Sequence, residues 1–193
     1  MLLVAIAVVA CAAPGTPGPS GTASALALPS LRTMDPTPSA GSLVPATVVR
    51  IVDGDTIHVA IAGREFTVRY IGMDTPETVA PGRPVELYGK EAAEANRALV
   101  DGRRVLLEKD VSETDRFGRL LRYVYIETPE GLVMVNAELV RLGYAQVATF
   151  PPDVKYVDLF LALQREARAE RRGLWADATP TPTASPATRS VAR

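Results

Sequence analysis

The sequence is poor in the side chains that most often bind transition metals or act as nucleophiles. Its 193 residues include one cysteine, Cys11, and one histidine, His58. An intrachain disulfide is therefore impossible, and a Cys/His zinc site or a two-histidine phosphodiesterase site is excluded. A Ser-His-Asp triad would need His58, which falls in the middle of a strand-like pattern. Hydrolytic chemistry in this chain must depend on carboxylates, arginines and a metal ion that prefers oxygen ligands.

An excess of positive charge is also absent. The formal net charge is −1, and residues 46–176 contain 18 Lys and Arg against 20 Asp and Glu. Domains that hold nucleic acid by bulk electrostatics are usually basic. A polyanionic substrate would therefore have to be bound locally, by a few placed arginines and a metal ion.

Two segments lack any usable apolar period. Residues 12–45 and 177–193 are rich in Pro, Gly, Ser, Thr and Ala. Such segments cannot bury enough apolar surface to offset chain entropy, so we predict a disordered linker and a disordered tail. Residues 46–176 carry most of the large apolar side chains and predict one domain of about 130 residues, a usual size for a single core.

The apolar run at the N-terminus is too short to cross a bilayer as a helix. Residues 1–10 suit the core of a signal peptide instead. The sequence Val8-Val9-Ala10-Cys11 resembles a bacterial lipoprotein box, in which the cysteine is lipidated and becomes the mature N-terminus. Because no Lys or Arg precedes the run, a plain secretory signal remains the alternative. We therefore expect an exported protein, either extracellular or anchored at Cys11 to the outer face of the bacterial cell membrane.

Short strands and turns alternate through most of the domain, followed by helical patterns. Evenly spaced short strands are typical of a small barrel. We predict an α+β fold, mainly β, built as a five-stranded OB-fold barrel with three helices. An exposed loop is expected at 78–87, and Leu174-Trp175 is expected to fold back as an apolar plug. The predicted strands are 46–52, 56–62, 65–72, 103–109 and 119–126, and the predicted helices are 88–100, 132–142 and 153–172.

Two acidic turns stand at the ends of neighbouring predicted strands. They are Asp53-Gly54-Asp55-Thr56 and Asp74-Thr75-Pro76-Glu77. Because the strands between them are predicted to run antiparallel, Asp55 and Asp74 should lie close together. Two adjacent carboxylates favour a hard cation such as Ca²⁺, with Mg²⁺ as a stricter alternative. A carboxylate at Glu77 could hold and deprotonate a water molecule beside that metal.

Two arginines lie near these turns in the predicted topology. Arg69 precedes Asp74 in its strand, and Arg119 follows the turn that begins at Asp115. Planar guanidinium groups bind phosphate oxygens in a fork that lysine cannot reproduce. Taken singly, each motif has a commoner structural explanation, and we interpret Asp53 and Asp115 as turn-stabilising residues. Their joint order predicts phosphodiester hydrolysis.

These motifs resemble, in order and spacing, those of the thermonuclease family, the staphylococcal or micrococcal nuclease type, over residues 46–176. The resemblance implies an OB-fold and calcium-dependent cleavage of DNA and RNA that leaves 3′-phosphates. The motifs that carry it are Ile51-Val52-Asp53-Gly54-Asp55-Thr56, Arg69 with Asp74-Thr75-Pro76-Glu77-Thr78, Tyr88-Gly89-Lys90-Glu91-Ala92, Asp115-Arg116-Phe117-Gly118-Arg119, Val135-Asn136-Ala137-Glu138-Leu139-Val140 and Gly173-Leu174-Trp175.

Residue roles follow from the resemblance position by position. It implies that Asp55 and Asp74 are calcium carboxylates and that Thr75 offers its main-chain carbonyl. It implies that Glu77 is the general base, a role that is disputed within the family. Arg69 and Arg119 would be the phosphate clamps, while Asn136 and Glu138 would belong to a helix that supports the fold.

The chain departs from the family where the substrate is held. Phe117 stands in place of a tyrosine that touches a terminal phosphate, and a phenylalanine cannot donate that hydrogen bond. Thr149 and Phe150 stand near tyrosines that contact the nucleotide, and Phe150 could still stack on a base. Arg83 and Arg116 stand near lysines that help to bind the polyanion. We therefore expect altered substrate affinity with an intact hydrolytic core.

The leading hypothesis is a secreted or surface-anchored nuclease that acts on DNA, RNA or both, and nothing in the sequence requires more than a monomer. An inactive OB-fold module that only binds nucleic acid or protein is the first alternative. Degenerate copies usually lose the acids or arginines, and here all are present. A calcium-stabilised structural domain is the second alternative, and it leaves Arg69 and Arg119 unexplained.

Overall fold

The structure is a computed structural model that describes residues 43–77 and 88–176. The signal segment, the loop predicted at 78–87 and the tail from 177 lie outside the described residues. One boundary needs correction. Strand β1 (Leu43–Ile51) starts three residues before the predicted domain, because Leu43, Val44 and Pro45 pair with strand β5 (Arg104–Glu108).

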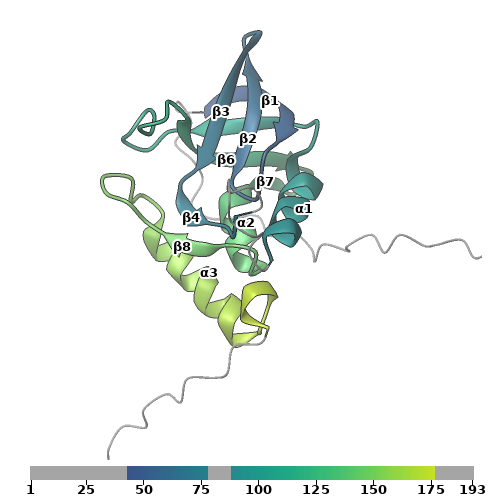
Figure 1. Ribbon diagram of the computed structural model, residues 1–193, viewed down its shortest axis with the longest axis vertical. Helices are drawn as coiled ribbons and strands as arrows, with labels where there is room; N and C mark the ends of the chain where they lie inside the picture. Colours follow the sequence, from purple (N-terminus) through teal and green to yellow (C-terminus); the bar gives the residue numbers. More distant parts are fainter. Residues whose placement is uncertain (1–42, 78–87, 177–193) are drawn as a thin grey trace, which may run out of the picture.

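The pairing of five strands closes a ring, which confirms the predicted OB-fold barrel (Figure 1). Strand β1 pairs antiparallel with β2 (Thr56–Ile61), and β2 pairs antiparallel with β3 (Arg64–Tyr70). Strand β3 then pairs in parallel with β6 (Leu120–Thr128), and β6 pairs with β5, which returns to β1. The β-branched and aliphatic residues that alternate along these strands fill the interior.

The predicted strand 65–72 is wrong at its end. Strand β3 ends at Tyr70, the chain bends, and a separate strand β4 (Gly72–Asp74) pairs with β8 (Gln146–Ala148). Gly72 makes the bend possible with φ of 82° and with the Phe160 ring against it, since a Cβ there would lie 2.2 Å from a ring carbon. The bend carries Asp74 away from the barrel sheet and onto its own small sheet.

The predicted helix 132–142 is also wrong in its first part. Residues Gly131–Met134 form strand β7, which pairs with β6, and helix α2 (Val135–Arg141) begins only afterwards. Leu132, Val133 and Met134 are an uninterrupted apolar run, and periodicity cannot distinguish such a run in a strand from one in a helix. The pairing with β6 decides in favour of the strand.

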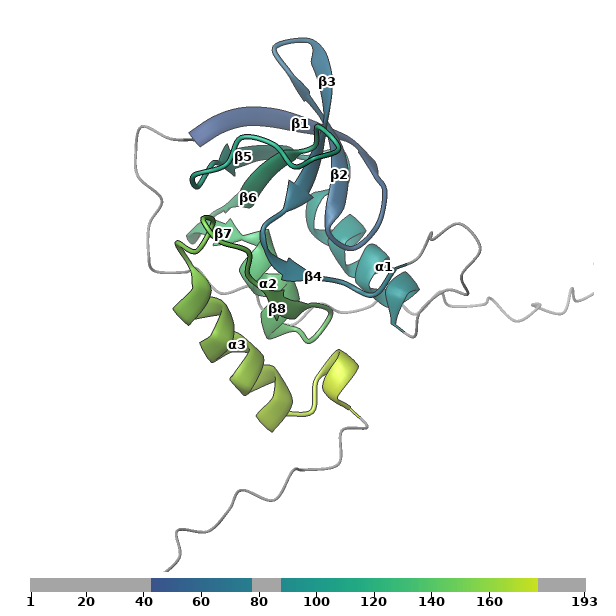
Figure 2. The ribbon, with the colours of Figure 1, turned by 60° about the vertical axis from the view of Figure 1, so that its left-hand side comes forward.

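Helix α2 lies between the barrel and the long helix α3 (Val157–Ala169), as Figure 2 shows. Helix α1 (Gly89–Val100) lies beside the barrel, and a 3₁₀ turn η1 (Gly173–Trp175) follows α3. Leu174-Trp175 folds back as expected, since the Leu174 amide donates to the carbonyl of Gly143 at 2.9 Å, but both residues are only half-buried and do not form a plug. Trp175 instead packs under the guanidinium of Arg168, 4.2 Å from its ring centroid. None of the described helices is long and apolar enough to span a membrane.

Helix α2 ties together the backbone that carries the acidic turns. The Nδ2 group of Asn136 donates to the carbonyl of Ile71 at 3.0 Å and to that of Arg122 at 3.3 Å. Its Oδ1 atom accepts the amide of Val124 at 2.8 Å. One buried amide side chain therefore joins the bend before β4 to β6. These two segments are distant in sequence, and the acidic turn at Asp74 follows the first of them.

Candidate active site

Asp55 lies in the turn between β1 and β2 with its side chain almost fully buried. Its carboxylate accepts the Thr56 hydroxyl at 3.0 Å and the backbone amide of Thr75 at 3.2 Å. Asp53 stabilises the same turn, because its Oδ1 atom accepts the backbone amide of Asp55 at 3.1 Å. The first acidic turn and the second one, at Thr75, are therefore in direct contact.

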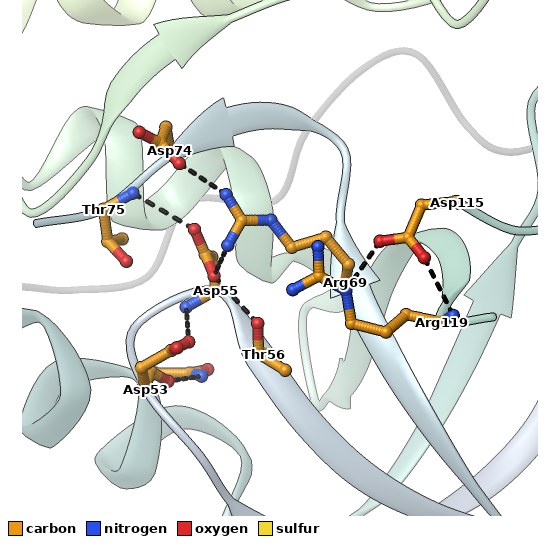
Figure 3. Close-up of polar contacts among 9 residues, drawn as sticks. Asp53, Asp55, Thr56, Arg69, Asp74, Thr75, Asp115 and Arg119 are labelled. Atoms are coloured by element: carbon orange, nitrogen blue, oxygen red, sulfur yellow. Dashed lines mark hydrogen bonds and ion pairs between the residues drawn. The ribbon is translucent and has the colours of Figure 1, made fainter. Parts of the chain in front are cut away.

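Strand register places Arg69 against this turn. Thr56 on β2 is paired with Arg69 on β3, so the arginine side chain starts beside Asp55. Arg69 donates from Nη1 to Asp55 and from Nη2 to Asp74 (Figure 3). The two acids that topology predicted to be neighbours are thus held on either side of one guanidinium. The bend at Gly72 brings Asp74 there, rather than a straight continuation of β3.

Burial destabilises the ionised form of Asp55. Loss of hydration raises the pKa of its carboxyl to about 8, although the guanidinium of Arg69 works in the opposite direction and nearby Asp53 adds to the rise. Burial and Asp53 therefore oppose ionisation of Asp55 more strongly than the guanidinium of Arg69 favours it. Additional positive charge beside Asp55 would be stabilising.

Helix α1 supports the acidic turn through a residue that sequence reasoning missed. Asn96 is fully buried, accepts the Tyr70 hydroxyl at 3.0 Å and donates to the carbonyl of Asp53 at 3.0 Å. The sequence contains an indication of this role, because Asn96 interrupts the apolar face of α1 that Ala92, Ala95 and Leu99 form. A polar residue on the buried face of a helix requires a partner.

Arg119 immediately precedes β6 and is held by Asp115. Its Nε–H donates to Asp115 at 2.6 Å, while the same carboxylate accepts the backbone amides of Phe117 at 2.9 Å and Arg119 at 3.0 Å. Burial alone would raise the pKa of Asp115, but these hydrogen bonds, led by that of the Arg119 side chain, hold it below its usual range. Figure 3 shows this pair on the opposite side of Arg69 from Asp74 and Thr75.

A cavity of about 260 Å³ brings both arginines to one place. Arg69 and Arg119 line it together with Asp115 and Phe150. Phe150 is 75% exposed, so its ring is accessible to a molecule in the cavity. The cavity thus offers two cationic forks and an exposed aromatic ring within the same space.

The segment that bears Phe150 is anchored by contacts that the sequence did not reveal. Asp153, which also lines the cavity, accepts the backbone amides of Val111 at 3.0 Å and Ser112 at 2.8 Å. The backbone amide of Lys155 donates to Asp110 at 2.9 Å. These bonds fix the wall of the cavity to the segment after β5.

Some predicted residues are not part of this cavity. Arg116 is exposed and contacts the ring of Phe117, 4.7 Å from its centroid, and neither residue lines the cavity. His58 pairs with Arg50 at 2.9 Å, as expected for a strand residue with a structural role. Glu77 is exposed at the end of the first described segment. Arg83 and Cys11 lie outside the described residues.

Oxygen atoms are the available metal donors at the acidic turns. Among residues 43–77 and 88–176 no three His, Cys, Asp or Glu side chains form a group that could hold a metal ion. Two carboxylates, on Asp55 and Asp74, and the nearby main-chain carbonyl of Thr75 remain. Such a set fits a hard cation that completes its shell with water or substrate, because carboxylate and carbonyl oxygens are the ligands that such cations prefer.

Comparison with known proteins agrees with this geometry. Residues 67–177 match the family described as staphylococcal nuclease homologue. The chain is 38% identical over 130 residues to a thermonuclease of Staphylococcus hyicus, which covers 67% of this chain and 75% of the relative. It is 40% identical over 128 residues to a thermonuclease of Staphylococcus intermedius, covering 66% and 74% of the two chains.

A third relative shares the domain within a longer protein. The SPbeta prophage-derived endonuclease YokF of Bacillus subtilis is 41% identical over 135 residues, which cover 69% of this chain and only 44% of YokF. The match therefore concerns one domain rather than the whole of that relative. The family match covers more than half of the chain, and the ring of strands is the OB barrel expected of that family. Together with relatives of this similarity, these findings show that the chain belongs to the staphylococcal nuclease homologue family.

Proposed function

We propose that this protein is a calcium-dependent nuclease that hydrolyses phosphodiester bonds in DNA, with RNA as a further substrate, and leaves 3′-phosphates. The observation that carries the proposal is the convergence of Arg69 and Arg119 on one cavity beside Asp55 and Asp74. The names of the relatives, thermonuclease and endonuclease, support the same reaction class.

The two arginines would stabilise the charge that develops on the phosphoryl oxygens. Both guanidinium groups are partly exposed, with 18% of the Arg69 side chain and 30% of the Arg119 side chain accessible. Each is oriented by a carboxylate before substrate arrives. Donors that are oriented in advance stabilise a transition state without the cost of rearranging.

Asp55, Asp74 and the carbonyl of Thr75 would hold the calcium ion. When bound, the ion would supply positive charge that polarises the phosphoryl group and lowers the pKa of a coordinated water molecule. The protein's own contribution is to keep the two acids together, through the Thr75 amide on Asp55 and through Arg69 between them.

Glu77 would act as the general base. It lies two residues beyond Thr75 on the same turn and is exposed to solvent, so its carboxylate can reach a water molecule near the acids. The backbone around it is held by helix α1, because a Cβ on Gly89 would lie only 2.9 Å from the carbonyl of Glu77. That close approach fixes the backbone of the turn that bears Glu77.

Phe150 would stack on a base of the substrate strand, and Arg83 and Arg116 would add weaker contacts to the phosphate backbone. The protein would act as a monomer. The apolar run at residues 1–10 supports export, with the protein either free outside the cell or held by a lipid on Cys11. Mass spectrometry of the native N-terminus distinguishes these two forms, since only lipidation adds acyl chains to Cys11.

Calcium-dependent digestion tests the central proposal. We expect the purified protein to digest denatured DNA with calcium, to stop when a chelator is added, and to resume when calcium is restored. Product ends should be resistant to extension by a polymerase until a phosphatase removes the 3′-phosphate. Arg64→Ala, on the hairpin away from the cavity, should leave the rate unchanged. Binding without cleavage over a broad range of pH and calcium would instead establish the inactive binding module.

A further inference from the structure

A second cavity, of about 210 Å³, is lined by Asp74 and Thr75 of the second acidic turn. It shares no lining residue with the first cavity, but the two meet at one ion pair. Arg69 lines the first cavity, Asp74 lines the second, and these two side chains are hydrogen-bonded. The residues around the second cavity are Asp74, Thr75, Pro76, Gln146, Leu174 and Trp175.

The base of the second cavity is formed by paired strands. Asp74 on β4 is the direct antiparallel partner of Gln146 on β8, and directly opposed residues project to the same face of a sheet. The Gln146 side chain is exposed. One carboxylate and one amide side chain therefore stand side by side at the junction of the two cavities.

The opposite wall is fixed by backbone contacts between η1 and the turn after α2. The amide of Leu174 donates to the carbonyl of Gly143 at 2.9 Å. A Cβ on Gly143 would lie 2.3 Å from the carbonyl oxygen of Arg172, so only glycine permits this approach. Arg172 adds a bond to the carbonyl of Arg141 at 2.8 Å. The wall that bears Trp175 is thus a built part of the fold.

Trp175 has an unsatisfied hydrogen-bond donor. Its Nε1 atom is buried and has no hydrogen-bond partner among the described residues. Buried polar groups without partners are uncommon and often mark a place where a ligand or an ordered water completes the bonding. An indole ring that is only half-buried also offers apolar surface to a planar partner.

The charge of the residues that line the second cavity favours a neutral occupant over a phosphate. No Lys or Arg is among its lining residues, and Asp74 contributes a carboxylate. A neutral, flat group with hydrogen-bonding edges suits Gln146 and the indole better than an anion does. A phosphodiester carries a nucleoside on each side of its phosphorus, so a strand bound by the arginines must extend in two directions from the Arg69–Asp74 pair.

We propose that this second cavity binds the nucleobase on the side of the scissile phosphate opposite to the base at Phe150. The inference rests on the proposed nuclease function and assigns the residues that select substrate on that side. The indole of Trp175 and the side chain of Leu174 contact the base, and the Gln146 amide bonds its edge. Gln146 and Trp175 are thus specificity-determining residues for an internal position of a strand.

Trp175 is the only tryptophan of the chain, so tryptophan fluorescence reports on the surroundings of this one indole. The probe is an end-labelled oligothymidylate with phosphorothioate linkages, titrated in calcium, with binding followed by the anisotropy of the label. We expect the tryptophan emission to change and to saturate at the same strand concentration as the anisotropy. A strand that binds without any change in Trp175 emission overturns the proposal.

Kinetics supply a test that does not depend on fluorescence. Gln146→Phe fills the cavity and should raise the KM for an oligonucleotide about tenfold, as one obstructed base contact predicts. The KM for a thymidine nitrophenyl phosphodiester, which has no second nucleoside, should not change. Gln146→Ala should act in the same direction with a smaller effect. Leu161→Phe, an exposed substitution on α3, is the matched control and should affect neither substrate.

The possible outcomes distinguish a failure of the second base site from a failure of the proposed nuclease function. Equal KM values of Gln146→Phe and the parent protein for the oligonucleotide, with cleavage intact, refute the second base site and leave the nuclease function standing. Absence of calcium-dependent cleavage of both substrates by the parent protein refutes the two together. Circular dichroism melting curves establish that each variant is folded, and Gln146→Ala retains the test if Gln146→Phe does not fold.

Discussion

The carboxylate of Asp115 holds the Nε–H of Arg119 at 2.6 Å while it also accepts two backbone amides of its own turn. One acid therefore fixes both the shape of the glycine turn and the direction of the guanidinium. The bond uses the Nε side of the fork and leaves the terminal nitrogens for a phosphate. The sequence suggested a structural role for Asp115, and the geometry shows that this role includes orienting the Arg119 guanidinium.

Asp115→Asn should lower kcat by about 10- to 100-fold, since the weakened bond lets the Arg119 fork drift from the geometry that the transition state needs. KM should change much less, because ground-state binding also uses Arg69. Asp101→Asn, at the exposed end of α1, is the control. A change in KM with kcat unchanged would show that Asp115 does not orient Arg119 for the transition state.

Arg69→Lys and Arg119→Lys should each lower kcat by about 10²- to 10³-fold, the usual loss when one oriented donor to a developing oxyanion is removed. Lysine keeps the charge but not the planar fork, so the comparison isolates geometry from charge. Steady-state rates on denatured DNA provide the measurement. Arg97→Lys on the exposed face of α1 is the matched control, and wild-type turnover in either clamp variant would show that the arginine is misassigned.

Asp55→Asn should stabilise the metal-free protein at pH 8. The folded-state pKa of Asp55 is raised to about 8, above its unfolded value, so the folded form gains stability from this group at low pH and loses it as pH rises toward 8. An asparagine does not titrate and removes that loss. Melting temperatures between pH 4 and pH 8 in chelator give the measurement.

The same variant should lose the rise in melting temperature that calcium produces in the parent protein, because one of the two proposed carboxylate ligands is gone. Asp53→Asn should retain a calcium response. If Asp55→Asn were stabilised by calcium as strongly as the parent protein, Asp55 would not be a ligand.

Glu108→Gln should destabilise the protein at pH 7 by about 1.5–3 kcal/mol, the usual value of hydrogen bonds to a charged group. The buried carboxylate accepts the hydroxyls of Tyr125 at 2.7 Å and Tyr156 at 2.9 Å and pairs with Lys155 at 2.5 Å. Burial would raise its pKa, but these bonds, led by that from Lys155, outweigh burial and lower the pKa.

Because the folded-state pKa of Glu108 is depressed, its stabilisation is present above the unfolded value and is lost as pH falls through the folded one. The difference in unfolding free energy between Glu108→Gln and the parent protein should therefore shrink on acidification below about pH 4.5. Urea unfolding at several pH values measures it, with the exposed Glu65→Gln as control. A constant difference across pH would show that Glu108 is not ionised in the folded protein.

The barrel and the chemical character of the site could be predicted from local sequence. Short strands with turn residues between them indicate a β-barrel. The scarcity of cysteine and histidine leaves oxygen ligands, and two acidic turns with two arginines indicate a phosphate-directed site. The predictions were wrong where the local pattern is ambiguous. The apolar run of β7 was predicted as the start of a helix, and the glycine bend before β4 was predicted as part of a continuous strand.

Tertiary structure decided which residues meet. The parallel pairing of β3 with β6 places Arg69 and Arg119 at one cavity, although fifty residues separate them in the chain. The bend at Gly72 carries Asp74 to the far side of Arg69, where β8 and η1 complete a second cavity with Gln146 and Trp175. Periodicity and turn chemistry act over a few residues, whereas these contacts depend on strand register and on the packing of distant segments, which only the folded chain determines.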